Sequence, residues 1–211
     1  PASGASSHWR RGVIVHDQHL ATQPAGVSLL LEVRDAKGSL VRRVQPPSAN
    51  SFLRSFMRQM HAQFMSGSIK ATGTSGAASY PSYLISIGGW GRDDVGNVSS
   101  GIVIGRSDAA VVGSQFRLGS LIRHGINPGS MTYNVGTAEP EVIAAGTVSG
   151  KYWRTFTNNG GSAVTAKEVG FGIGLGATHR WLAIRDITGG GGVRVGTLQS
   201  LTVTYTLRTI R

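Results

Sequence analysis

The sequence contains no cysteine, few acidic residues and no long apolar run. Without cysteine, the chain has no disulfide, no thiolate ligand for a metal and no cysteine nucleophile. No apolar stretch approaches the roughly 20 residues that a membrane-spanning helix needs. The opening stretch PASGASSHWRRG also lacks the apolar core of a signal peptide. We therefore expect a protein that is made and used in solution and has no membrane partner.

The shortage of acidic residues leaves the chain strongly basic. Ten acidic residues stand against 21 basic ones, which gives a formal net charge of +11, and 17 of the basic residues are arginine. Residues 1–70, 71–150 and 151–211 carry balances of +6, −1 and +6. Arginine suits planar contacts with phosphate or carboxylate, so this segregation suggests a polyanion or an acidic protein neighbour near the two ends of the chain. The alternative is a coding preference for arginine with no such partner.

Only one segment has a persuasive helical period. The chain holds 31 glycines, about twice the usual share, which disfavours helices elsewhere. Ser48 is a plausible N-cap after two prolines, and the next segment repeats Phe52, Phe56, Met60 and Phe64 at i+4 spacing. This predicts an amphipathic helix from Ser48 to about Met65, whose apolar stripe we interpret as core packing rather than a ligand site.

The rest of the chain has the pattern of a β protein. Candidate strands, separated by glycine, serine, asparagine and proline, are 83–87, 101–104, 131–135, 142–148, 152–157, 168–175, 181–187 and 201–210. In the last run, Leu201, Val203, Tyr205 and Leu207 alternate with polar residues, which predicts one apolar and one polar face. Two further runs around residues 35–38 predict a β-hairpin over 27–44, preceded by an arm over 1–26.

This spacing is typical of an antiparallel sandwich or barrel. We expect a mainly β fold: an antiparallel, jelly-roll-like β-sandwich with one amphipathic helix and an extended N-terminal arm. The expected division is 1–46 for the arm and hairpin, 47–66 for the helix, and 67–211 for the β-sandwich, packed with the helix as one domain.

The stretch GFGIGLG, residues 170–176, invites a comparison with glycine-rich phosphate loops. Those loops need glycines at GxGxxG or GxxxxGK[ST] spacing, followed by a helix, and neither is present. With a period of two, Phe171, Ile173 and Leu175 instead share one face of a strand. The other face is left bare by Gly170, Gly172, Gly174 and Gly176. We interpret this bare face as a place where sheets or subunits pack closely.

Catalytic and metal-binding motifs are missing from the sequence. No HExxH or GxSxG motif occurs, and the pair His16 and His19 has no third ligand. Asp93 and Asp94 lie in a glycine-flanked loop, where aspartates usually cap turns; Glu139 and Glu141 flank a proline in another loop. We therefore expect no enzymatic activity, no metal, no cofactor and no small-molecule substrate.

Nucleic-acid binding would need basic residues interleaved with aromatic ones. The nearest candidates are KYWR at 151–154 and HRW at 179–181, which we interpret as half-buried aromatics at a sheet edge. The residues expected to face a polyanion or a neighbouring subunit are Arg10, Arg11, Arg42 and Arg43, together with Arg54 and Arg58 on the flank of the helix.

The C-terminal third carries a more specific pattern. RTFTNNGGSAVTAKEVGFGI, WLAIRDI and GTLQSLTVTYTLR supply an F-T-N turn at 156–158, Glu168 and Gly170 in one strand, Arg185 and Asp186 in another, and a closing strand with Tyr205. This pattern resembles structural proteins of tailed-bacteriophage virions, and SFLRSFMRQMHAQFM and IVIGRSDAAVVGSQFRLGSLIRHG extend the resemblance upstream, over roughly residues 50–210.

The resemblance implies a non-enzymatic virion component of the head, neck or tail, present in many symmetric copies and located in the virion. Its implied partners are copies of itself and other virion proteins, with non-specific contact with packaged DNA. The alternative function is a free nucleic-acid-binding module built on a β-barrel.

Overall fold

The computed structural model describes residues 25–46, 71–72, 74, 76, 78–79, 93–144, 147–175 and 179–210. The expected helix at 48–65, the strand at 83–87 and residues 1–24 of the arm lie outside this part of the chain. The regular elements in this part of the chain are all β-strands, and every pairing between them is antiparallel. The prediction of a mainly β, antiparallel chain is confirmed.

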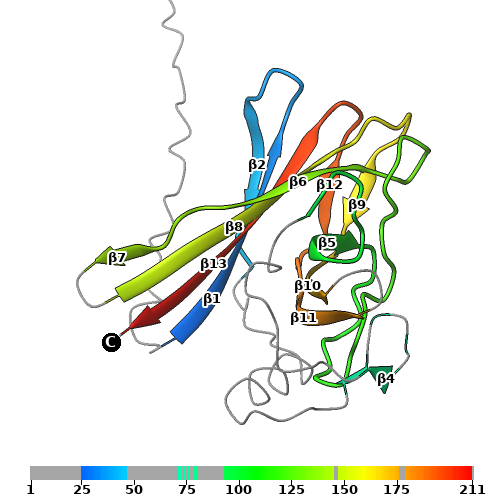
Figure 1. Ribbon diagram of the computed structural model, residues 1–211. Helices are drawn as coiled ribbons and strands as arrows, with labels where there is room; N and C mark the ends of the chain where they lie inside the picture. The colour runs from blue at the N-terminus through cyan, green and yellow to red at the C-terminus, as the bar shows by residue number, and fades with distance from the viewer. Residues whose placement is uncertain are drawn as a thin grey trace, which may run out of the picture.

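The larger sheet has six strands (Figure 1). Their order is β2 (Leu40–Val44), β1 (Ala25–Arg34), β13 (Ser200–Ile210), β8 (Thr147–Thr157) and β6 (Thr132–Ala138), with β7 (Val142–Ala144) also paired to β8. The chain's first and last described strands, β1 and β13, are therefore neighbours along their whole length. The hairpin expected over 27–44 is part of this sheet.

The β1–β2 turn forms for the reason that the sequence suggests. The Asp35 side chain accepts hydrogen bonds from the backbone N–H groups of Lys37 (2.9 Å) and Ser39 (2.9 Å). Gly38 has a φ of +82°, a conformation that glycine adopts without steric cost. The predicted hairpin is confirmed.

Side chains alternate across the larger sheet as expected. In β13, Leu201, Val203 and Tyr205 are fully buried, whereas Thr202 and Thr204 are half-buried on the opposite face. This is the pattern of a sheet with one face packed and the other wet. The prediction for this run therefore holds as far as Tyr205, but Leu207, on the same face, is 38% exposed.

A second sheet of three strands packs against the dry face of the first. Its order is β11 (His179–Ile187), β10 (Glu168–Leu175) and β5 (Gly101–Gly105). Phe171 of β10 meets the rings of Tyr152 in β8 and Tyr205 in β13 edge-on, with centroids 5.2 and 6.1 Å apart. The two sheets thus share one apolar core.

Two small ribbons complete the described strands. One pairs β9 (Val164–Ala166) with β12 (Val193–Val195), and the other pairs β3 (Ala71–Thr72) with β4 (Ala78–Ser79). The four glycines at 189–192, which join β11 to β12, all have positive φ. The run expected as one strand at 142–148 is instead divided between β7 and β8, which pair with each other.

Candidate functional site

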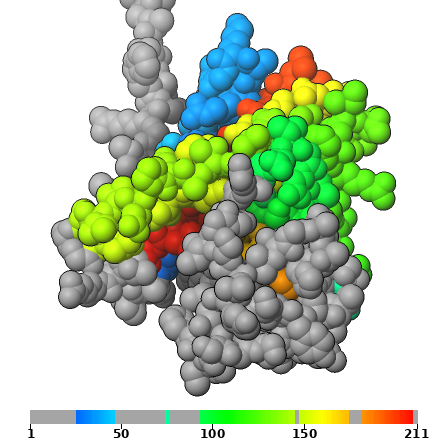
Figure 2. All heavy atoms as spheres, viewed as in Figure 1, coloured from blue at the N-terminus to red at the C-terminus, as the bar shows by residue number. Residues whose placement is uncertain are grey.

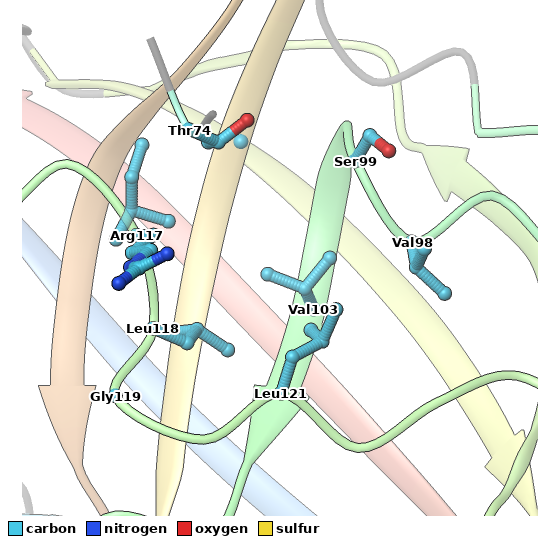
Figure 3. Close-up of a pocket in the computed structure, with 10 residues that line it drawn as sticks. Thr74, Val98, Ser99, Val103, Arg117, Leu118, Gly119 and Leu121 are labelled. Atoms are coloured by element: carbon cyan, nitrogen blue, oxygen red, sulfur yellow. The ribbon is translucent and has the colours of Figure 1, made fainter. Parts of the chain in front are cut away.

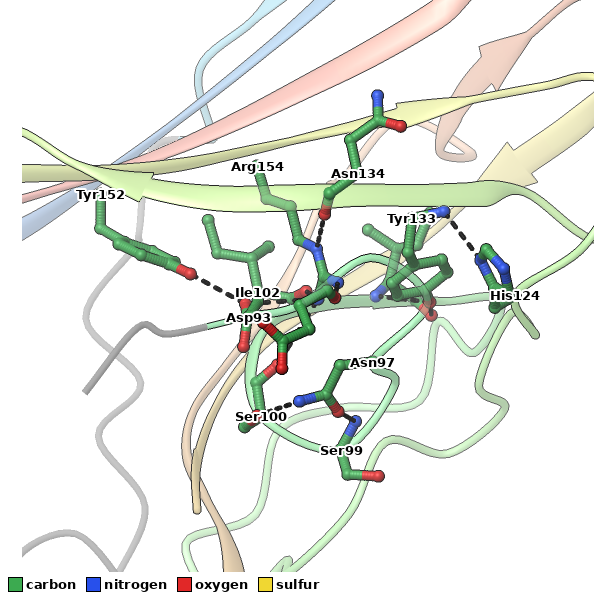
Figure 4. A network of polar contacts seen from close by, with 12 residues as sticks. Asp93, Asn97, Ser99, Ser100, Ile102, His124, Tyr133, Asn134, Tyr152 and Arg154 are labelled. Carbon is green, nitrogen blue, oxygen red and sulfur yellow. Dashed lines mark hydrogen bonds and ion pairs between the residues drawn. The ribbon is translucent and has the colours of Figure 1, made fainter. Parts of the chain in front are cut away.

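A buried ion pair joins the two sheets (Figure 4). Arg154, on the inward face of β8, lies 3.2 Å from the carboxylate of Asp93, and both side chains are fully buried. Tyr152, two residues earlier on the same face, donates a hydrogen bond of 2.8 Å to the same carboxylate oxygen. The guanidinium also donates to the backbone carbonyls of Asn134 (2.7 Å) and Ile102 (3.0 Å). These contacts connect β8 and β6 of the larger sheet to β5 of the smaller one.

This arrangement corrects two interpretations of the sequence. Asp93 is not an exposed turn cap, because it is 1% exposed and its carboxylate holds the ion pair. The aromatic and basic residues at 151–154 do not lie at an edge, because β8 runs between β13 and β6. Tyr152 and Arg154 are buried there and are committed to contacts within the chain.

Burial sets the proton positions in this cluster. Burial raises the pKa of Tyr152, and the neighbouring Asp93 charge raises it further, so the phenol stays protonated and acts as a donor. Burial also raises the pKa of Asp93 and lowers that of Arg154, while each partner's charge opposes the shift. The cluster therefore holds its protons in place, which suits a structural connection between sheets.

A second buried ion pair fixes the segment 106–121 to the smaller sheet. Arg185 of β11 lies 2.8 Å from the carboxylate of Glu168 in β10, with both side chains fully buried. Glu168 accepts further hydrogen bonds from the backbone N–H groups of Gly119 (3.0 Å) and Ser120 (2.8 Å). Arg185 donates to the carbonyl of Ala109 at 3.0 Å. The ion pair thus contacts the segment near its start, at Ala109, and near its end, at Gly119 and Ser120.

Other polar residues in the C-terminal third of the chain also make contacts within the fold. The Asn158 amide donates to the carbonyls of Ser162 (2.9 Å) and Val195 (3.0 Å), which ties the turn at 158–162 to the end of β12. Tyr205 donates to the carboxylate of Asp186 at 3.0 Å inside the core. Buried polar groups need such partners, so the physical role of these residues in this chain is to fix turns and strands.

The glycine-bared face of β10 lies beside a hollow of about 490 Å³ (Figure 3). A Cβ on Gly172 would lie 3.1 Å from the carbonyl oxygen of Ser99, and one on Gly170 would lie 2.7 Å from Leu182. Backbone and side chains of the same chain therefore approach this face closely. Gly174 belongs to β10, and Gly176 lies outside the described residues. The hollow is lined by Thr74, Val98, Ser99, Val103, Arg117, Leu118, Gly119, Leu121, Gly172 and Leu182.

One end of the larger sheet exposes apolar side chains on the face that elsewhere forms the core. Ile143 is 71% exposed, and it pairs with Val148, which is 37% exposed. Leu207 of β13 lies diagonally across from Val148, opposite Gly150. A Cβ on Gly150 would meet nothing within 4 Å. We call Ile143, Val148 and Leu207 the apolar strip; Figures 1 and 2 show this end of the sheet projecting away from β5, β10 and β11.

The arginines singled out in the sequence have different surroundings. Arg43 lies 2.6 Å from the carboxylate of Glu32, so its charge is matched within the chain. Arg42, opposite Val33, is exposed at the sheet edge. Arg10, Arg11, Arg54 and Arg58 lie outside the described residues, as do His16 and His19.

A different basic cluster was not singled out in the sequence. Arg106, Arg123 and His124 line a hollow of about 470 Å³ beside the turn at 127–130. The signal in the sequence was weak, because these residues are separated by an ordinary glycine- and serine-rich stretch. The apolar strip was equally hidden, since its residues follow the same alternation as the core.

Within the described ranges, no group of three histidine, cysteine, aspartate or glutamate side chains is placed to hold a metal ion. None of the described residues forms a helix long and apolar enough to cross a membrane. Glu139 is paired with Lys151 at 3.4 Å on the surface.

Comparison with known proteins finds no family model, no curated protein and no solved structure that matches this chain.

Proposed function

We propose that this chain is a non-enzymatic structural subunit of a bacteriophage virion, in the capsid, neck or tail. In this proposal its two sheets form a jelly-roll-like β-sandwich that assembles in several symmetric copies with other virion proteins. The observation that carries the proposal is the apolar strip, Ile143, Val148 and Leu207, whose side chains are exposed at one end of the larger sheet.

The strip supports assembly because its side chains gain from burial. Fully burying a side chain of this size stabilises a structure by about 1.5–3 kcal/mol, and contiguous exposed apolar groups commonly mark protein interfaces. β7, which carries Ile143 of the strip, is also a short edge strand, and an edge strand can pair with another chain. A second copy, or another coat protein, would cover both the side chains and the edge.

The pairing of the buried charged residues with one another supports the same proposal. Arg154 with Asp93 and Arg185 with Glu168 are paired inside the fold and bind backbone groups, as expected of polar residues that define one rigid shape. A subunit that works by fitting its neighbours needs this rigidity more than it needs reactive groups.

The test is the association state of the full chain and of a strip variant. We expect the wild-type protein to form a discrete multimer by native mass spectrometry at physiological salt. We expect Ile143→Asp to dissociate it, because a charge at the centre of an apolar contact is expensive to bury. Val112→Asp is the matched control, since Val112 is also exposed (55%) but lies in the segment 106–121.

Both variants should unfold within about 0.5 kcal/mol of the wild-type subunit, because each substitution is at an exposed position. A monomeric wild-type protein, or equal dissociation by both variants, would contradict the assembly proposal. A monomer that binds oligonucleotides with a steep salt dependence would favour the alternative, a free nucleic-acid-binding β-barrel module.

A further inference from the structure

The hollow beside the turn at 127–130 concentrates positive charge. It is lined by Arg106, Leu121, Arg123, His124, Asn127, Pro128, Gly129 and Ser130. Three of these residues are basic and none is acidic. In the described part of the chain, neither Arg106 nor Arg123 makes an ion pair. Arg43, by contrast, forms an ion pair with Glu32.

Backbone contacts hold the turn itself in place. Pro128 and Gly129 form its centre, with Gly129 at a φ of +82° and the N–H of Ser130 donating to the carbonyl of Asn127 at 2.9 Å. The N–H of Met131 then donates to the carbonyl of Arg123 at 3.0 Å. This fixes the turn against the segment 121–124, which carries Arg123 and His124.

Two of the three basic side chains are also oriented. The Arg106 guanidinium donates to the carbonyl of Gly129, and a Cβ at Gly129 would lie 2.7 Å from that guanidinium. The His124 ring accepts a hydrogen bond of 3.1 Å on Nδ1 from the backbone N–H of Tyr133 (Figure 4). Arg106 and His124 are therefore arranged before any ligand arrives.

We propose that this hollow binds the phosphate groups of a nucleic-acid backbone. Arginine presents planar donors that match phosphate oxygens, and such charge-assisted hydrogen bonds are strong. The hollow has a volume of about 470 Å³ and is open to solvent. Arg106, Arg123 and His124 are all exposed, so a polymer can reach them, and the net charge of +11 would draw it there. The inference does not depend on the apolar strip.

The experiment measures binding of the full chain to a short fluorescein-labelled DNA duplex by fluorescence anisotropy, between about 50 and 200 mM salt. Each phosphate contact contributes about 0.9 to the slope of log affinity against log salt on duplex DNA. We expect Arg123→Ala to reduce that slope by about 1 and Arg106→Ala with Arg123→Ala to reduce it by about 2. Arg123→Lys keeps the charge and should retain most of the slope.

Arg194→Ala is the matched control, because Arg194 is an exposed arginine on β12 that does not line the hollow. The double variant also removes the contact between Arg106 and Gly129, which can alter the turn. Arg123→Ala leaves that contact intact and is therefore the decisive variant. Thermal unfolding of each variant checks that it is folded. If Arg194→Ala lowered the salt slope by the same amount, the effect would come from the overall charge of the protein, and the proposal would be overturned. Failure of the wild type to bind, or displacement of the duplex by an equal concentration of inorganic phosphate, would also overturn it.

Discussion

The two ends of strand β8 face different surroundings. At one end, Tyr152, Arg154 and Phe156 point inward and are buried, and Tyr152 and Arg154 contact strands of the smaller sheet. At the other end, Val148 and Gly150 point to the same side of the same strand, yet Val148 is 37% exposed and Gly150 faces open space. One alternating strand is therefore packed into the core at one end and leaves an apolar side chain exposed at the other.

The largest effect should come from removing the charge of Arg154 at the covered end. Arg154→Met leaves the Asp93 carboxylate buried without its cation, and breaking a buried pair in this way costs about 3–5 kcal/mol. We expect this loss in the free energy of unfolding by urea. Replacing both partners, as Arg154→Met with Asp93→Leu, should recover part of it. A single substitution costing less than about 1 kcal/mol would show that the pair does not hold the sheets together.

A pair of glycine substitutions compares the two ends directly. A Cβ on Gly136 of β6 would overlap the hydroxyl of Tyr152, whereas a Cβ on Gly150 of β8 meets nothing within 4 Å. We expect Gly136→Ala to destabilise the protein by about 1–3 kcal/mol through overpacking. Gly150→Ala should be neutral or stabilising by up to about 1 kcal/mol, since alanine costs less entropy than glycine. Thermal unfolding measures both, and equal effects would remove the distinction between the ends.

The smallest effect concerns an ion pair on the wet face. Although partial burial raises the pKa of Glu32, its contacts with Arg43 and Arg34 outweigh this and lower the pKa below 4.5. The folded state thus favours the ionised carboxylate, so its stabilisation is complete above pH 4.5 and is lost as the pH falls through the lower, folded-state pKa. We expect a loss of roughly 0.2–1 kcal/mol, typical of exposed pairs.

Glu32→Gln should abolish this part of the acid dependence in unfolding curves measured from pH 6 to pH 3. Glu139→Gln is the control, because Glu139 forms a looser surface pair with Lys151 at 3.4 Å. An unchanged acid dependence in Glu32→Gln would show that the pair on the wet face contributes nothing measurable.

Local patterns in the sequence were sufficient to predict the hairpin around Asp35 and Gly38 and the alternation of β13. Both depend on residues within a few positions of one another. Asp93 could not be assigned in this way, because its partner Arg154 is 61 residues away and an aspartate in a glycine-rich loop is usually exposed. β12 was missed because it has only three residues.

The candidate surfaces were harder to predict than the strands. Leu207 has the same alternation as Tyr205, and only the extent of the covering sheet decides that one is exposed and the other buried. Arg106 and His124 come together because the segment 121–124 runs beside β5, with Leu121 bridged to Gly105. Such tertiary placement leaves no local period in the sequence.

The pairing of β1 with β13 also determines where attached polypeptide would emerge. Ala25 lies opposite Thr209, and Val27 lies opposite Leu207 of the apolar strip. Segments joined to either strand at this end start within a few residues of the strip. A fluorescent protein or affinity tag fused there would be carried to the proposed contact surface, whereas an insertion in the β1–β2 turn at residues 35–38 would sit at the opposite end of β1 and leave that surface free.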